Sequence, residues 1–143
     1  MRLQTASETI SFSKAEIEEK AAKLYDDLAS RFDDKGGDFS TFAKENRKFA
    51  KQIQMAYQHV ITDAIEGCYA FDLESDDHIL DTDLAQGASL SDAVAKAIAT
   101  EDKIIAFYEK ATEQSGPLLA DVPRNFKIIV KKRNKRLDTL KSM

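Results

Sequence analysis

The sequence predicts an all-α protein: an up-and-down bundle of four helices, with a long crossover between the second helix and the third. Four segments repeat apolar residues at spacings of three and four, which is the period of a helix that buries one face. Turn-forming residues separate the first helix from the second and the third from the fourth, whereas residues 68–88 lack helical periodicity. Short links make consecutive helices antiparallel, and the long stretch must therefore cross the surface of the bundle.

The first helix is expected over residues 13–33. Ser13 is placed to cap its N-terminus, and Glu16 would complete a capping box three residues later. Gly36 and Gly37 follow its end, and we expect them to supply the left-handed conformations that a tight reversal needs. Its apolar stripe consists of Ile17, Ala21, Leu24, Leu28 and Phe32.

The second helix is expected over residues 39–66 and the third over residues 90–115. Ser89 or Ser91 is placed to begin the third helix, because serine is a favoured N-cap residue. The pair Gly116-Pro117 should end it, with glycine just past the last turn and proline after it.

The fourth helix is expected over residues 122–141. Asp121 would cap it, and Pro123 lies in the first turn, where the missing amide hydrogen costs nothing. One charged residue, Arg133, falls within its apolar stripe, a position that is unfavourable for arginine unless it meets carboxylates. The stripe consists of Phe126, Ile129, Val130, Arg133, Leu137 and Leu140.

Length and composition indicate one domain, residues 1–143, and the presence of a single cysteine fits a reducing compartment. Cys68 is the only cysteine, so the chain can form neither an internal disulfide nor a cysteine-based zinc cluster. No run of residues approaches the roughly 18 apolar residues that a membrane span needs. The N-terminus also lacks a basic stretch followed by an apolar run. We therefore expect a cytoplasmic protein without a membrane partner.

Charge is distributed unevenly along the chain. Residues 72–83 are rich in aspartate and glutamate and contain no lysine or arginine, whereas lysine and arginine dominate residues 124–141. Solvated surfaces are the favoured interpretation, because the chain is acidic overall and no aromatic residues interleave the lysines, as they would in a nucleic-acid surface. A calcium loop beginning at Asp72 is a poor match, since Asp77 stands where the loop requires glycine.

One pair of residue types occurs twice at the same spacing. Glu18 precedes Tyr25 by seven residues, and Glu101 precedes Tyr108 by seven residues. Seven residues are nearly two helical turns, so each pair lies on one face, among residues expected in the core. An unpaired carboxylate costs several kcal/mol in an apolar interior. Two inward glutamates therefore require a positive partner, either a metal ion or a basic side chain.

Together with Glu45 in the second helix, this repeated pattern resembles the ferritin-like superfamily, and most closely its rubrerythrin-like branch, over residues 13–141. The resemblance implies a di-iron or di-manganese centre, held by one glutamate from each of two helices and by a Glu-x-x-His pair from each of the other two. On that comparison, Glu18, Glu45 and Glu101 match ligand positions of the family.

The other ligands of such a centre are missing. Lys48 stands where the histidine after Glu45 would be, and the fourth helix has lysines and an arginine in place of the second Glu-x-x-His pair. His59 lies about 21 Å along the helix from Glu45 at 1.5 Å per residue. His78 lies in the crossover, so neither histidine replaces a ligand.

We expect that Arg133, together with Lys48, occupies the volume of the missing metals and pairs with the inward glutamates. The two tyrosines would donate hydrogen bonds to the same carboxylates. The alternative is that the fourth helix is rotated, so that Arg133 extends to solvent. The expected members of the cluster are Glu18, Glu45, Glu101, Lys48, Arg133, Tyr25 and Tyr108.

The missing ligands favour a non-catalytic binding or assembly module without a cofactor. The alternative is a mononuclear iron or manganese site on Glu18, Glu45 and Glu101, because carboxylates bind hard divalent ions. In that case the resemblance implies a rubrerythrin-like oxidoreductase that acts on peroxide or oxygen. The resemblance also implies a homodimer, and a binding module implies a protein partner that the residues do not name.

Overall fold

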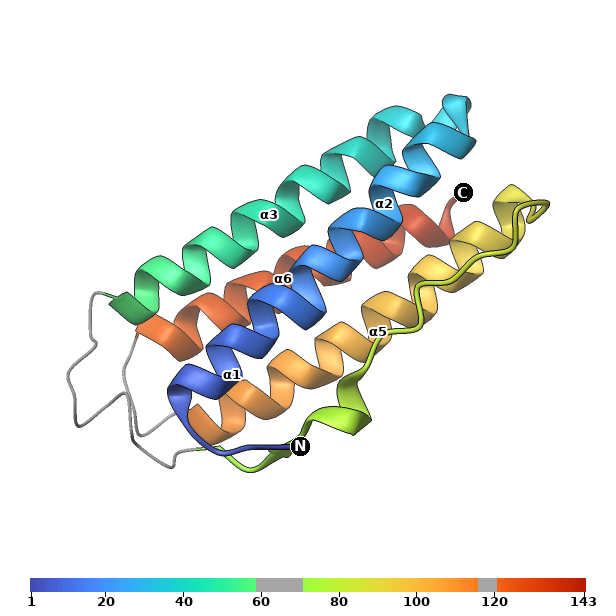
Figure 1. Cartoon of the computed structure of the whole chain (residues 1–143). Helices are drawn as coiled ribbons and strands as arrows, with labels where there is room; N and C mark the ends of the chain where they lie inside the picture. The colour runs from blue at the N-terminus through green and yellow to red at the C-terminus, as the bar shows by residue number, and fades with distance from the viewer. Residues whose placement is uncertain (59–70, 116–120) are drawn as a thin grey trace.

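The computed structural model describes residues 1–58, 71–115 and 121–143, and these residues form the predicted all-α fold. Helices α1 (Ala6–Phe12) and α2 (Glu19–Arg31) are joined end to end through a π-helical segment, Ser13–Glu18. Helix α3 spans Gly36–Gln58, α5 spans Leu90–Ser115 and α6 spans Asp121–Lys141. Figure 1 shows these helices lying side by side along a common direction, as in a helical bundle.

The order of the helices in space follows the lengths of their connections. Helix α2 packs against α3, α5 packs against α6, and α3 also packs against α6. The chain reverses direction between α2 and α3 and again between α5 and α6 (Figure 1). Between α3 and α5, the described part of the connection runs back along the length of the bundle (Figure 1). A crossover therefore lies where the aperiodic stretch predicted one.

The predicted third and fourth helices agree with α5 and α6, except that α6 already includes Asp121, the residue predicted to cap it. Ser89 caps α5: its Oγ accepts a hydrogen bond from the Asp92 amide at 3.1 Å, and the Asp92 carboxylate accepts one from the Ser89 amide at 3.2 Å. The predicted second helix corresponds to α3, which begins three residues earlier than expected, at Gly36, and is described as far as Gln58. Its expected remainder, residues 59–66, and the expected stop at residues 116–117 lie outside the described residues. No described helix has the length and apolar character needed to cross a membrane.

The first helix begins seven residues earlier than predicted, and Ser13 is not its N-cap. Thr5 caps α1 instead. Its Oγ1 accepts a hydrogen bond from the Glu8 amide at 3.1 Å, and the Glu8 carboxylate accepts one from the Thr5 amide at 3.0 Å. Thr5 and Glu8 have the same Thr/Ser-x-x-Glu spacing as Ser13 and Glu16, but they come earlier in the chain. The apolar stripe also extends upstream to Ile10, and helical structure therefore begins before Ser13. Ser13 lies within the helical segment and is fully buried.

The reversal after α2 uses no left-handed glycine, contrary to the prediction. None of the described glycines has a positive φ angle. Phe32 leaves the helix with φ −126° and ψ 83°, and a short 3-10 turn, Asp33–Lys35, leads directly into α3 at Gly36. Arg31, the last residue of α2, connects this reversal to the crossover by donating hydrogen bonds to the backbone oxygens of Leu84 and Ala85. The reversal is therefore stabilised by tertiary contacts rather than by glycine conformation.

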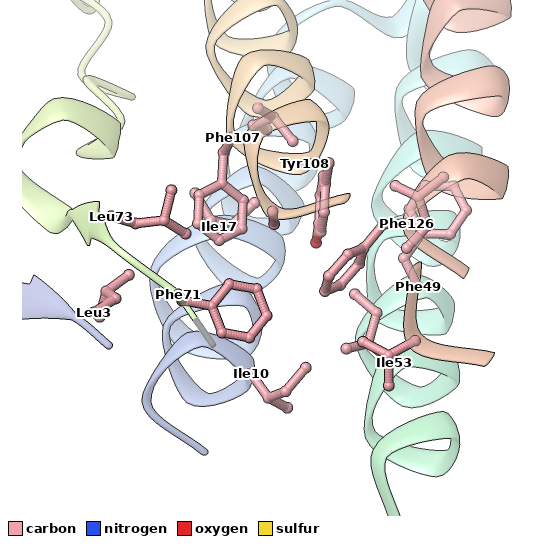
Figure 2. Packing of buried hydrophobic residues seen from close by; sticks show 14 of the residues in the cluster. Leu3, Ile10, Ile17, Phe49, Ile53, Phe71, Leu73, Phe107, Tyr108 and Phe126 are labelled. Atoms are coloured by element: carbon pink, nitrogen blue, oxygen red, sulfur yellow. The ribbon is translucent and has the colours of Figure 1, made fainter. Parts of the chain in front are cut away.

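The crossover contributes to the core, which composition alone does not indicate. A two-residue strand, β1 (Arg2–Leu3), pairs antiparallel with β2 (Leu73–Glu74), and a 3-10 turn, Ser75–His78, follows. Strands this short show no readable periodicity. Figure 2 shows Leu3, Leu73 and Phe71 directed toward the same apolar region as Ile10 and Phe107.

Buried apolar residues form two clusters along the bundle. One gathers around Ile17, Phe49, Tyr108 and Phe126, as Figure 2 shows, and the other contains Tyr25, Phe39, Phe42 and Leu140. Hydrogen bonds from Tyr25 and Tyr108 lead from these clusters to buried charged side chains. The middle of the bundle therefore contains polar groups with apolar packing on either side.

His78 is a buried titratable residue of the crossover that packs against α5. The side chain is 5% exposed, its ring lies edge-on to Phe107 at 5.2 Å, and its Nε2 has no hydrogen-bond partner among the described residues. Burial, and then the nearby Lys110, lower the pKa of His78 below its ordinary value of 6.5, against the opposite effect of Asp77. The packed state therefore favours neutral histidine.

Replacing His78 by phenylalanine should remove an acid-dependent loss of stability. Because the folded pKa lies below 6.5, the contribution of neutral His78 is complete above that pH and is lost as the pH falls through and below it. Urea unfolding of the wild type and of His78→Phe should therefore diverge between about pH 7.5 and pH 5.5, with the wild type losing more. His59→Phe reports the contribution of the chain's other histidine, and equal slopes for wild type and His78→Phe would refute the prediction.

Candidate functional site: a buried arginine–carboxylate network

Arg133 lies in the centre of the bundle between two glutamates. Its Nη1 donates to Glu101 Oε2 at 2.7 Å, and its Nη2 donates to Glu18 Oε1. All three side chains are fully buried, and they come from α6, α5 and the π-helical segment. The structure therefore brings together the arginine and two of the three acids that the sequence analysis singled out, and Arg133 does not extend to solvent.

The two tyrosines of the repeated motif bond across the bundle, each to the other motif's glutamate. Tyr25 Oη donates to Glu101 Oε1 at 2.7 Å, and Tyr108 Oη donates to Glu18 Oε2 at 2.5 Å. A tyrosine hydroxyl has one hydrogen, so Tyr108 must accept from Ser13, whose Oγ lies 2.8 Å from Tyr108 Oη. Each carboxylate thus receives at least one phenol and one guanidinium hydrogen bond.

The π-helical segment explains how Ser13 reaches this network. The amide of Glu19 donates to the carbonyl of Lys14, the five-residue bond of a π-helix. This wider turn places residues five apart next to each other, and Ser13 and Glu18 are five apart and both contact Tyr108. Sequence reasoning did not find Ser13 as a site residue because its pattern also fits an N-cap.

Arg136 is a second buried cation, which the sequence analysis missed. It donates from Nη1 to Glu101 Oε1 at 2.9 Å and to Asn46 Oδ1 at 2.5 Å, and from Nη2 to Glu45 Oε1 at 3.1 Å. Its guanidinium carbon also lies 4.7 Å from the centre of the Phe42 ring, within the range of a cation–π contact. The available signal was its position three residues after Arg133 and one before Leu137, on the edge of the apolar stripe.

Two predicted members of the cluster lie elsewhere. Lys48 is exposed on α3 and takes no part in the network, so its predicted role is wrong. Phe42, Asn46 and Phe49 form the inward face of α3, and Lys48 lies about 100° around the helix from Phe49. Glu45 is at the margin, with 39% of its side chain exposed, and its partner is Arg136 rather than Arg133.

The two fully buried carboxylates of the network face two buried guanidiniums, but the two acids are not equivalent. Burial acts to raise the pKa of Glu101, but Arg133 and Arg136 outweigh it and hold that pKa below its ordinary value. Burial raises the pKa of Glu18 above its ordinary value, because Arg133 and the Tyr108 hydrogen bond only partly offset the lost solvation. Glu101 is therefore the principal anion of the centre.

The two tyrosines and Arg133 hold their ordinary charge states firmly. Burial raises the pKa of Tyr25 and Tyr108 well above the ordinary value, so both phenols remain protonated hydrogen-bond donors. Burial acts to lower the pKa of Arg133, but Glu101 and Glu18 more than compensate and raise it. Groups that keep their protons in this way are suited to holding a structure and poorly suited to general acid–base catalysis near neutral pH.

A metal ion would have to compete with these contacts. Glu18 and Glu101 direct their oxygens to guanidinium and phenol hydrogens, and Arg133 lies between them. Among the described residues, no group of three histidine, cysteine, aspartate or glutamate side chains is arranged to hold a metal ion. The residues present therefore do not fit the dinuclear centre that the family resemblance implies.

Comparisons of the chain with protein-family models, with curated proteins and with solved structures found no match. Functional inference consequently depends on the residues and their geometry. The buried network is the most distinctive chemical feature of the described residues, because fully buried charges are rare unless they are paired.

Proposed function

We propose that this chain is a non-catalytic protein with a ferritin-like, rubrerythrin-like four-helix bundle, in which arginine occupies the position of a lost metal centre, and that it serves as a binding or assembly module. The observation that supports this most directly is the pairing of Arg133 with both Glu18 and Glu101. Those glutamates are two of the three residues that match ligand positions in the resemblance. A guanidinium supplies the positive charge there that a metal would otherwise supply.

The second arginine strengthens this proposal. Two divalent ions neutralise several carboxylates, whereas one guanidinium balances one. Arg136 provides the second positive charge and binds Glu101 together with Glu45, the third glutamate of the resemblance. All three glutamates that match ligand positions thus have an arginine partner. A mononuclear iron or manganese site on Glu18, Glu45 and Glu101 would have to displace both arginines.

Metal analysis of freshly purified protein tests the proposal. We expect substoichiometric iron and manganese, and no rise in the unfolding temperature when Fe²⁺ or Mn²⁺ is added, because an ion that binds only the folded state would raise it. About one ion per chain, lost in both Glu18→Gln and Glu45→Gln, would establish the mononuclear site and overturn the proposal. Metal retained by both variants identifies adventitious surface binding.

A further inference from the structure

An apolar groove with acidic surroundings lies beside the N-terminal strand. Its volume is about 540 Å³, and its apolar lining includes Phe12 and Ile79. Ile79 is 47% exposed, although large apolar side chains usually pack inward. Glu8 and Glu16 line the same groove, and the exposed Asp76 and Asp77 belong to the adjoining 3-10 turn. The Met1 ammonium, which also lines the groove, pairs with Glu74, as does Arg2, and Lys20 pairs with Glu16. Glu8, Asp76 and Asp77 form no ion pair among the described residues, so the surroundings remain acidic.

The opposite arrangement occurs on α6, where an exposed apolar residue is surrounded by cations. Ile128 is 41% exposed. Arg124, Lys131 and Lys132 lie three or four residues from it and are exposed as well. The helix therefore presents one apolar side chain within a basic surface. Charge complementarity of this kind selects partners and orients their encounter.

We propose that the basic face of α6 around Ile128 docks into the acidic groove around Ile79 of a second copy of this chain. This inference rests on the assembly function proposed above and specifies the interface. The chain carries both halves of a complementary pair, an acid-rimmed apolar hollow and a cation-rimmed apolar side chain. A second copy therefore supplies an occupant of the required chemistry without any other protein.

Charge also restricts which surfaces of the two copies can meet. Two grooves facing each other would bring Glu8, Asp76 and Asp77 of one copy against the same acids of the other, and two α6 faces would juxtapose lysines. Like charges placed opposite each other are unfavourable. The groove-to-helix contact instead pairs opposite signs. Such a contact forms either a head-to-tail dimer, which retains one free groove and one free α6 face, or a two-fold dimer in which both groove-to-helix contacts form at once.

The test uses sedimentation velocity on the full chain and on two single variants, Ile128→Asp and Ile79→Asp. We expect the average mass of the wild type to rise with concentration and each variant to remain monomeric. An aspartate on α6 enters an acidic groove, and an aspartate in the groove removes its apolar centre. An equimolar mixture of the two variants should form dimers and nothing larger, because each variant keeps the one surface that the other has lost.

Controls separate this interface from other causes of association. Ala95 is exposed on α5 and belongs to neither surface, so Ala95→Asp should associate like the wild type. Added salt should weaken association, because the charges that attract are exposed. A monomeric wild type, a variant that associates normally, or a mixture that remains monomeric would each overturn the proposed interface. None of these outcomes bears on metal content, and so the non-catalytic assignment is tested separately.

Discussion

Replacing Arg133 by leucine should lower the free energy of unfolding by about 3–5 kcal/mol, the usual cost of removing one partner from a buried ion pair. The substitution leaves Glu18 and Glu101 fully buried without the cation that lies between them. Arg136 can compensate only at Glu101, to which it already donates. Urea unfolding at neutral pH, monitored by circular dichroism, measures the difference directly.

Lys48→Leu is the matched control for this measurement. It removes one cation and adds the same apolar side chain, but on the exposed face of α3. Surface substitutions of this kind change stability by no more than about 0.5 kcal/mol. Arg133→Lys should fall between the two, because an ammonium keeps the charge but cannot make two divergent hydrogen bonds from one planar group. If Arg133→Leu were as harmless as Lys48→Leu, the network would contribute nothing to the fold.

The buried centre could be predicted from the sequence to the extent that its members disturb an apolar pattern. Glu18 and Glu101 lie on inward faces beside residues that must be buried, and Arg133 interrupts a stripe of large apolar residues. Each of these charges is unfavourable alone, so their mutual pairing follows from electrostatics once the helices are packed. The tyrosines follow from the same periodicity, because seven residues return a side chain to the same face.

Residues whose roles depend on tertiary geometry could not be predicted in this way. Arg136 lies in a run of basic residues that predicts a solvent-exposed helix face. Arg136 is buried because α6 packs against α3. Ser13 reaches Tyr108 because the helix widens at that point, and no residue pattern identifies a π-helical segment. The start of the first helix was ambiguous for a related reason, since the capping-box spacing occurs twice within one stretch, although only Thr5 and Glu8 form the box.

The buried ion pairs can contribute to the positioning of the helices as well as to stability. Replacing a buried ion pair by apolar residues is often neutral or stabilising, so stability alone does not explain its presence. In this chain, the network connects α6 to the π-helical segment and α5 through Arg133, and to α3 through Arg136. It therefore fixes the axial position of α6 relative to its neighbours, a register that interchangeable leucines would leave less defined.

Replacing Glu101 by glutamine should cost about 3–5 kcal/mol at neutral pH, whereas Glu18→Gln should cost about 1–3 kcal/mol. Glu101 accepts hydrogen bonds from Tyr25, Arg133 and Arg136, and its loss leaves two guanidinium groups against one buried carboxylate. Glu18 already has a raised pKa, so the neutral amide resembles a state that the folded protein tolerates. The difference between the variants therefore measures the asymmetry of the two acids.

The pH dependence of the same variants should differ in sign. Because the pKa of Glu101 is lower in the folded state than its unfolded value of 4.5, ionised Glu101 stabilises the fold above pH 4.5. This stabilisation is lost as the pH falls through the folded pKa. Glu101→Gln should therefore lose less stability in acid than the wild type does. The raised pKa of Glu18 contributes stability below 4.5 that is lost as the pH rises through the folded value. Glu18→Gln should therefore gain relative to the wild type as the pH rises from about 4 to 8. Parallel curves for both variants would mean that the two carboxyls have the same environment, in contradiction to their different pairing with Arg136.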